Sequence, residues 1–410
     1  MKNFLIGLGM TCFMLANCAP TPQNISETKS VKRPSGKAVK YGYGPEIPED
    51  ARPNDATMRL YIQKARTFMR NQIRNGEVYT VRPAGNAVPF DIDVSSTSQT
   101  LEREFNEGYL LSYLYYDDGV VKYDAVPAKA RFNTVINNDS YFFTHSTGKS
   151  ITSYIVGHAI CEGYISSIDE PVDWPQMSEM LYQGQPLIDL LNMKAGDAHT
   201  VQPGATRWKG SGEHHRRLRL QQVAKILRGT QESSKALFYN NTLTDLIANY
   251  TAYKAGDQFD TLMKKIFREK VKIENPVYLE KQNRISYSYF ITRNDLLRIA
   301  VAMMKDYQNG TCVGQYLKDL QAQQIPWPNY GAHDKRTVLM MNYARYYGGQ
   351  FYWGFDGMRS RNIMGANGAL GQNILIDLDN SRIVVTQAIA AGWDTKALMV
   401  DVIKKGELPN

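Results

Sequence analysis

The chain contains 410 residues, 43% of them hydrophobic and 21% charged, which is the composition of a globular protein with room for two domains. No apolar run beyond the N-terminus is long enough to span a membrane, so we expect a mature protein that is soluble or tethered only at its N-terminus. The net charge of +8 could favour an anionic membrane surface. We interpret it instead as a solvated basic face and predict no nucleic-acid partner.

The first 18 residues have the pattern of an export signal. Lys2 provides a positive start, and Phe4–Leu15 is an apolar run too short to span a membrane. Leu-Ala-Asn-Cys at 15–18 resembles the lipobox of bacterial lipoproteins, in which the cysteine carries a lipid. Asn17 departs from the small residue usual there, so plain cleavage is the alternative. We expect export and a lipid anchor on Cys18, facing the periplasm.

The folded part begins after a tether. Residues 19–55 are rich in Pro, Ser, Thr, Lys and Gly, which is typical of a flexible linker. Apolar residues at helical spacing predict an amphipathic helix over Met58–Ile73. Two strand-like runs flank Asp117-Asp118-Gly119, a strong hairpin signal. A short strand over Phe132–Ile136 and a helix within Thr144–Gly163 are expected next.

The rest of the chain is helical and then rich in strands. Helices are predicted over Leu187–Met193, Leu218–Leu227, Leu243–Tyr253, Phe259–Val271 and Arg293–Tyr307. Strands are predicted over Tyr346–Phe355, Asn373–Asp377 and Ile383–Ala388, followed by a helix over Asp394–Lys405 capped by Asp394. The prediction is an α+β fold. An antiparallel sheet built from both chain ends (56–164 and 337–410) is flanked by helices and carries a mainly helical inserted domain (165–336).

Ser146 and Lys149 are the first candidates for catalysis. They lie three residues apart and would therefore share one face of the first helical turn. A lysine can act as a base toward a serine hydroxyl if burial and nearby positive charge lower its pKa. Alone, the pattern could equally be a helix cap with a surface lysine, and Ser26 and Lys29 in the tether match it too.

Two later motifs can complete such a site. Tyr239 could share the proton transfers, and Asn241 could hydrogen-bond to the serine and lysine, although Tyr-Asn-Asn could also be a turn that caps the next helix. Gly365–Gln372 is a glycine-rich run that leads into a strand. Glycines there allow a ligand to approach the backbone, but a tight turn or bulge would explain them as well.

Together these motifs resemble the β-lactamase and penicillin-recognising serine hydrolases. The run Ser-Thr-Gly-Lys-Ser-Ile-Thr-Ser from Ser146, Tyr-Asn-Asn from Tyr239 and the late glycine-rich motif occur in the family's order, and the resemblance covers 109–402. It is nearest to the branch that contains class C-type esterases and 6-aminohexanoate-dimer hydrolases. The resemblance implies a β-lactamase/transpeptidase-like fold and acyl transfer through a covalent intermediate.

The resemblance also assigns roles to residues. Ser146 would be the nucleophile, Lys149 and Tyr239 the general base and acid, and Asn241 would hold their network. The oxyanion would lie between the backbone N–H groups of Ser146 and Ala369. No metal or organic cofactor is implied, and the expected partner is a small ester or amide substrate.

The cleft would be lined by Gly368 and Gly371, and Trp208 could either line it as well or simply hold its own loop in place. One position departs from the family: the Lys or His that heads the third motif is Ala366 here. In members that bind β-lactams this cation helps to hold the substrate carboxylate, so Ala366 favours an ester or amide hydrolase. A penicillin-binding carboxypeptidase or β-lactamase, and an inactive surface-tethered relative, are the alternatives.

The remaining reactive side chains are given structural roles. After removal of the signal, Cys161 and Cys312 are the remaining cysteines, and we interpret them as small buried apolar residues rather than a redox pair. No Cys and His cluster has zinc spacing. His145 precedes the nucleophile, and we expect it to pack or to hydrogen-bond within its loop.

Overall fold

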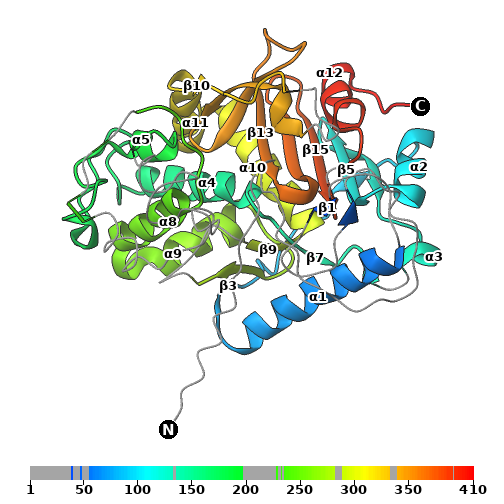
Figure 1. Cartoon of the computed structure of the whole chain (residues 1–410), viewed down its shortest axis with the longest axis horizontal. Helices are drawn as coiled ribbons and strands as arrows, with labels where there is room; N and C mark the ends of the chain where they lie inside the picture. The colour runs from blue at the N-terminus through cyan, green and yellow to red at the C-terminus, as the bar shows by residue number, and fades with distance from the viewer. Residues whose placement is uncertain are drawn as a thin grey trace.

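The molecule is built around a nine-stranded sheet with the order β10-β11-β12-β13-β14-β15-β5-β6-β4 (Figure 1). The computed structural model describes residues 38–39, 47–48, 55–132, 135–196, 228–229, 232, 235–281, 289–332, 339–390 and 392–410. The strands of this sheet are β4 (Asp91–Ile92), β5 (Leu110–Asp117), β6 (Val120–Ala125), β10 (Ile325–Pro326), β11 (Ala344–Gly348), β12 (Phe351–Phe355), β13 (Ile363–Gly368), β14 (Gln372–Asp377) and β15 (Arg382–Ala388). Because β5 pairs with β15, both ends of the chain contribute to one sheet, as predicted.

Of the two hairpins considered next, one was predicted from its turn residues and the other was missed. Asp118 and Gly119 join β5 to β6 with φ values of 42° and 95°, which confirms the Asp-Gly hairpin. The single strand predicted over Tyr346–Phe355 is wrong, because the chain turns at Gly349 and Gln350 (φ 59° and 68°) and returns as β12. The Gly348-Gly349 pair is a recognised hairpin signal that could have shown this turn.

A second sheet, which the sequence did not predict, has the order β3-β8-β9-β7. Its strands are β3 (Val78–Val81), β7 (Tyr141–Phe143), β8 (Val277–Glu280) and β9 (Tyr289–Thr292). The strand expected over Phe132–Ile136 is wrong, since Phe132 ends the short helix α3 (Lys129–Phe132). A further two-stranded sheet pairs β1 (Ala38–Val39) with β2 (Ile47–Pro48).

The helices lie mostly where the periodicity predicted them, although those over Gln99–Glu107 and Cys312–Ala322 were not predicted. They are α1 (Asp55–Arg74), α2 (Gln99–Glu107), α4 (Thr147–Cys161), α5 (Leu187–Leu191), α8 (Thr242–Ala255), α9 (Phe259–Lys264), α10 (Arg293–Asn309), α11 (Cys312–Ala322) and α12 (Asp401–Lys405). Helix α4 contacts α8, α11 and β13, so it lies in the centre of the molecule (Figure 1). All but its last turns are buried, including Ile151, Tyr154 and Ala159. The helix predicted over Leu218–Leu227 lies outside the described residues.

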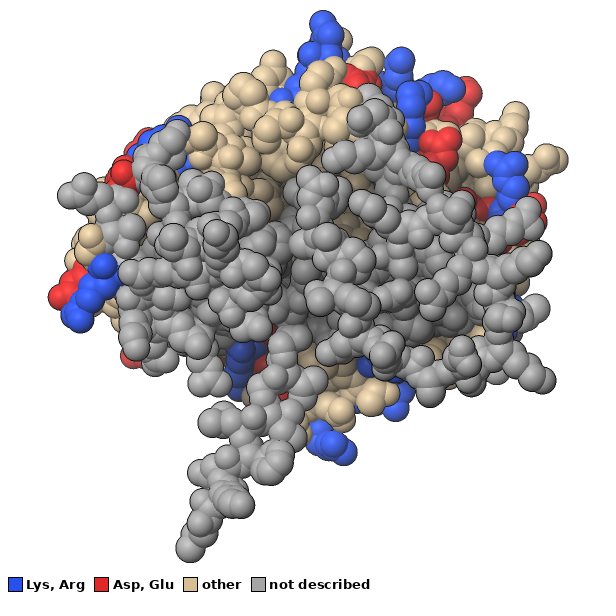
Figure 2. All heavy atoms as spheres, viewed as in Figure 1, with Lys and Arg blue, Asp and Glu red and all other residues tan. Residues whose placement is uncertain are grey.

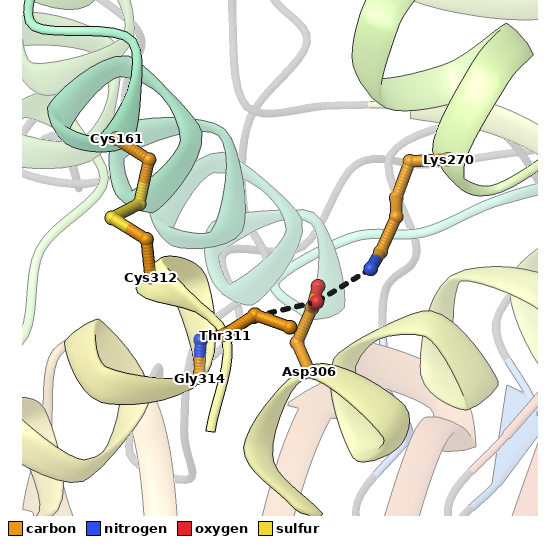
Figure 3. Close-up of a disulfide and its surroundings, with 6 residues drawn as sticks. All are labelled: Cys161, Lys270, Asp306, Thr311, Cys312 and Gly314. Carbon is orange, nitrogen blue, oxygen red and sulfur yellow. Dashed lines mark hydrogen bonds and ion pairs between the residues drawn. A yellow bond between two sulfur atoms is a disulfide. The ribbon is translucent and has the colours of Figure 1, made fainter. Parts of the chain in front are cut away.

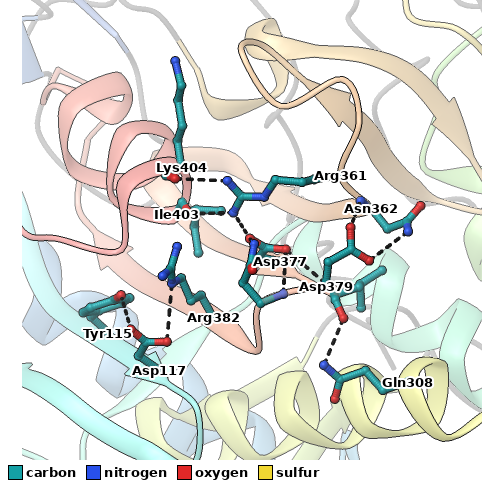
Figure 4. A network of polar contacts seen from close by, with 12 residues as sticks. Tyr115, Asp117, Gln308, Arg361, Asn362, Asp377, Asp379, Arg382, Ile403 and Lys404 are labelled. Atoms are coloured by element: carbon teal, nitrogen blue, oxygen red, sulfur yellow. Dashed lines mark hydrogen bonds and ion pairs between the residues drawn. The ribbon is translucent and has the colours of Figure 1, made fainter.

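The C-terminal segment closes the outer side of the sheet. Asp394 caps it as predicted, because its carboxylate accepts a hydrogen bond of 2.9 Å from the backbone of Ala397. Arg361 donates to the carbonyl oxygens of Ile403 and Lys404 at the end of α12 and also pairs with the buried carboxylate of Asp377 (Figure 4). This arginine therefore fixes α12 against the strands.

The prediction for the two cysteines is wrong. Cys161 at the end of α4 and Cys312 at the start of α11 form a disulfide with a Cα–Cα distance of 5.8 Å (Figure 3). The two residues are 151 positions apart, and only the packing of α11 against α4 brings them together. Neither cysteine is fully buried. Beside them, the buried carboxylate of Asp306 accepts hydrogen bonds from Thr311 and Lys270.

Candidate active site

Ser146 lies at a sharp turn between the second sheet and the central helix. Thr144 is held to β9, because its N–H donates to the carbonyl oxygen of Tyr289 at 2.9 Å. His145 then adopts a positive φ of 48°, which is uncommon for a non-glycine residue, and Ser146 begins α4. The Ser146 side chain makes no capping hydrogen bond to the helix. The hydroxyl is therefore not used as a simple helix cap.

Lys149 is buried one turn further along the same helix. It is 1% exposed, and its Nζ donates to Oδ1 of Asn241 at 2.7 Å. The alternative of a surface lysine beside a helix cap is thus wrong for Lys149. A buried amine needs a polar partner, and Asn241 provides one.

The two asparagines of the Tyr-Asn-Asn motif make different hydrogen bonds. Asn240 caps α8, since its Oδ1 accepts a hydrogen bond of 2.9 Å from the backbone N–H of Leu243. Asn241, 4% exposed, makes no side-chain cap and instead faces Lys149. The capping explanation therefore holds for Asn240, whereas Asn241 binds Lys149 and its catalytic role stays a prediction.

Tyr239 faces the same lysine and belongs to an aromatic cluster. The Nζ of Lys149 lies 5.3 Å from the centroid of the Tyr239 ring. Tyr347 packs edge-on against this ring at 5.8 Å, and a side-chain hydrogen bond links Tyr352 to Tyr239. Burial raises the pKa values of Tyr347 and Tyr352 well above their usual range, so both phenols stay protonated at neutral pH. Tyr239, which is only partly buried, is the member of this cluster that faces Lys149.

The third motif approaches the turn around Ser146 at the end of β13. A side chain on Gly368 would overlap the carbonyl oxygen of Thr144, so only glycine allows the strand to approach so closely. The Thr147 hydroxyl also donates to the carbonyl oxygen of Gln372. The short turn Ala369–Gly371, in which Gly371 has a φ of 90°, therefore begins beside Ser146.

Ala366 and His145 behave as structural residues. Ala366 is 3% exposed and borders a small apolar space together with Ser150, Ile151 and Phe351. His145 packs edge-on against Phe143 with a ring-centroid distance of 4.6 Å, which confirms the expected packing role. Trp208 and Cys18 lie outside the described residues, so their predicted roles stay predictions.

Several residues near the site were not found from the sequence. Trp327 packs edge-on against Tyr239 at 6.1 Å, and Tyr347 and Tyr352 complete the aromatic cluster. These residues follow or lie in strands β10 to β12, far from Tyr239 in the sequence, and aromatic residues in strands carry no signal of their own. Within the described part of the chain, no group of three or more His, Cys, Asp or Glu could hold a metal ion.

The fold is shared with known structures. No family model matches the sequence, and no curated protein does. A proposed 6-aminohexanoate-dimer hydrolase from Bacillus anthracis superposes with a TM-score of 0.57 at 13% identity, covering 80% of this chain and 88% of that one. A proposed β-lactamase from Bacteroides dorei gives a TM-score of 0.51 at 14% identity, covering 75% and 92%. The chain therefore has the β-lactamase/transpeptidase-like fold that its motifs predicted.

Proposed function

We propose that this chain is a serine hydrolase that cleaves an ester or amide bond through an acyl-enzyme intermediate. The observation that carries the proposal is the burial of Lys149 one turn from Ser146, with Asn241 as its hydrogen-bond partner. A lysine is almost never fully buried without a paired or functional role. The fold shared with hydrolases supports the same reaction class.

In the proposed reaction, Oγ of Ser146 attacks the substrate carbonyl carbon and passes its proton to the network of Lys149 and Tyr239. The bond to the leaving group breaks, and the leaving oxygen or nitrogen receives that proton. Water then attacks the acyl-enzyme and restores Ser146. The backbone N–H groups of Ser146 and Ala369 would stabilise the oxyanion, and one such donor is typically worth about 10²–10³ in rate.

The substrate is proposed to be an uncharged or acyclic ester or amide rather than a penicillin. Ala366 is buried among apolar groups and has no cation to offer to a substrate carboxylate. The similarity to a structure named for 6-aminohexanoate-dimer hydrolysis supports a linear amide. The similarity to a proposed β-lactamase favours the second candidate, and stable labelling by a fluorescent penicillin would decide for it.

Export and lipidation at Cys18 are also proposed. The disulfide between Cys161 and Cys312 supports export, because disulfides persist in oxidising compartments and are rare in the cytosol. Within the described residues, no helix is long and apolar enough to cross a membrane. Metabolic labelling with a fatty acid would give a labelled protein, and Cys18→Ala should abolish the label.

The nucleophile is tested by a fluorophosphonate probe, followed by intact-mass measurement and peptide mapping. We expect one adduct on Ser146, lost in Ser146→Ala together with hydrolysis of short activated esters, while the melting temperature is retained. Ser150→Ala is the control, since its hydroxyl donates to the carbonyl oxygen of Gln350 at 2.6 Å instead of serving the reaction. An unlabelled protein with no esterase activity would support the inactive tethered relative.

A further inference from the structure

The positive charge of this protein is concentrated near one end of the chain. Residues 19–76 contain 11 Lys and Arg against 5 Asp and Glu, whereas residues 77–410 contain 36 against 35. The body of the protein is therefore almost neutral, and most of the net charge lies in the segment that ends with α1.

Helix α1 presents one exposed face that carries cations and no anions. The exposed residues of α1 recur with the helical period; they are Ala56, Leu60, Gln63, Lys64, Thr67, Arg70, Asn71 and Arg74. No Asp or Glu occurs between residues 56 and 76. Leu60, 44% exposed, adds a large apolar side chain to the same face.

The other arginines of α1 attach the helix to the body. Arg66 donates to the carbonyl oxygen of Val135 at 2.9 Å, and Arg59 donates to that of Arg131 at 2.7 Å. Among the described residues, no carboxylate forms an ion pair with Lys64, Arg70 or Arg74. The helix is therefore fixed on one side, and its exposed face carries Lys64, Arg70 and Arg74, of which Arg74 also donates to Oδ1 of Asn71 at 3.2 Å.

The placement of α1 leaves this face accessible. Figure 1 shows α1 along the lower edge of the molecule, outside both large sheets. Figure 2 shows separate Lys and Arg side chains at the surface near this edge. Lys64 and Arg74 are separated by ten residues, or about 15 Å along the helix axis.

We propose that the exposed face of α1 binds the anionic headgroups of a phospholipid bilayer. The three cations, which follow Leu60 along the helix, would attract anionic headgroups, and the exposed leucine could enter the apolar boundary beneath them. An acidic polymer in solution would use the cations but gain nothing from Leu60. The face would be a second attachment beside a lipid on Cys18.

Vesicle co-sedimentation of the full chain tests this proposal. All variants carry Cys18→Ala, so that no lipid on this residue contributes to binding. Binding to uncharged phosphatidylcholine vesicles measures the contribution of the apolar N-terminal run. Lys64→Gln, Arg70→Gln and Arg74→Gln together should weaken binding to phosphatidylglycerol vesicles by about a hundredfold, because each cation near an anionic surface is worth about a factor of five. Binding by the parent should also weaken as salt is added.

A matched control removes the same charge elsewhere. Arg103→Gln, Lys264→Gln and Lys405→Gln change three exposed cations on other helices and should leave binding within about twofold of the parent. An equal loss in this control, or equal binding to both kinds of vesicle, would overturn the proposal. Leu60→Ser should weaken vesicle binding but not binding to polyglutamate. Equal binding to polyglutamate and vesicles, unaffected by Leu60→Ser, would assign the face to an acidic polymer instead.

Discussion

The disulfide ties α4, the helix that follows Ser146, to α11, and the cost of removing it follows from the loop that it closes. Cys161 and Cys312 are separated by 151 residues. A cross-link across a loop of this length removes chain entropy from the unfolded state worth about 5 kcal/mol at 25 °C. Unfolding roughly 350 residues at about 2.1 cal/mol/K each converts this loss into a fall of about 7 °C in Tm.

Differential scanning calorimetry measures this fall directly. We expect the Cys161→Ser, Cys312→Ser double variant to melt about 7 °C below the wild type. A reductant should bring the wild type to the same temperature and leave the double variant unchanged. Because α8 and β13 also contact α4, the folded double variant should keep its esterase activity. Two titratable thiols in protein from an oxidising compartment, or a Tm unchanged within about 1 °C, would refute the reasoning.

Three further predictions concern the site and its surroundings. Asn241→Ala removes the hydrogen-bond acceptor of Lys149 and should lower kcat/KM for a short ester by about 10²-fold. Asn240→Ala instead removes a helix cap, so it should lower the free energy of unfolding by about 1 kcal/mol and leave kcat/KM unchanged. Gly368→Ala would collide with the Thr144 carbonyl and should reduce both esterase activity and Tm, and an unchanged rate would place β13 wrongly. Burial lowers the pKa of His158 to about 4, so the folded state resists protonation while the unfolded state accepts a proton near pH 6.5. Stability should therefore fall as pH drops from 6.5 to 4, and His158→Gln should flatten this part of a urea-denaturation series.

Local chemistry made most of the fold predictable. The Asp118-Gly119 turn and the period of α1, α4, α8 and α10 are written in neighbouring residues, and the structure has these elements where they were expected. The second sheet is different, because its strands are three or four residues long. So short a strand shows no alternation that separates it from a buried loop, and its identity comes from partners distant in the sequence.

The prediction for the two cysteines failed for the same reason. Cys161 and Cys312 occur in helical stretches with no spacing that would mark a pair, and their meeting depends on how α11 packs on α4. An export signal makes an oxidising compartment the expected destination, and two cysteines that remain after its removal are then candidates for one bridge. That compartment argument outweighs the low cysteine count.

The Ser-x-x-Lys motif alone does not identify a catalytic serine in this chain. The Ser-x-x-Lys pattern occurs at Ser26 and Ser146, and spacing alone treats both alike. Ser26 and Lys29 lie outside the described residues, whereas Lys149 is buried against an amide from another helix. The turn around Ser146 is one that β13 can approach only because residue 368 is glycine. Burying an amine without a hydrogen-bond partner would be costly, and Asn241 offsets that cost for Lys149. The pairing of residues 92 positions apart, rather than the tetrapeptide, is therefore the argument for catalysis.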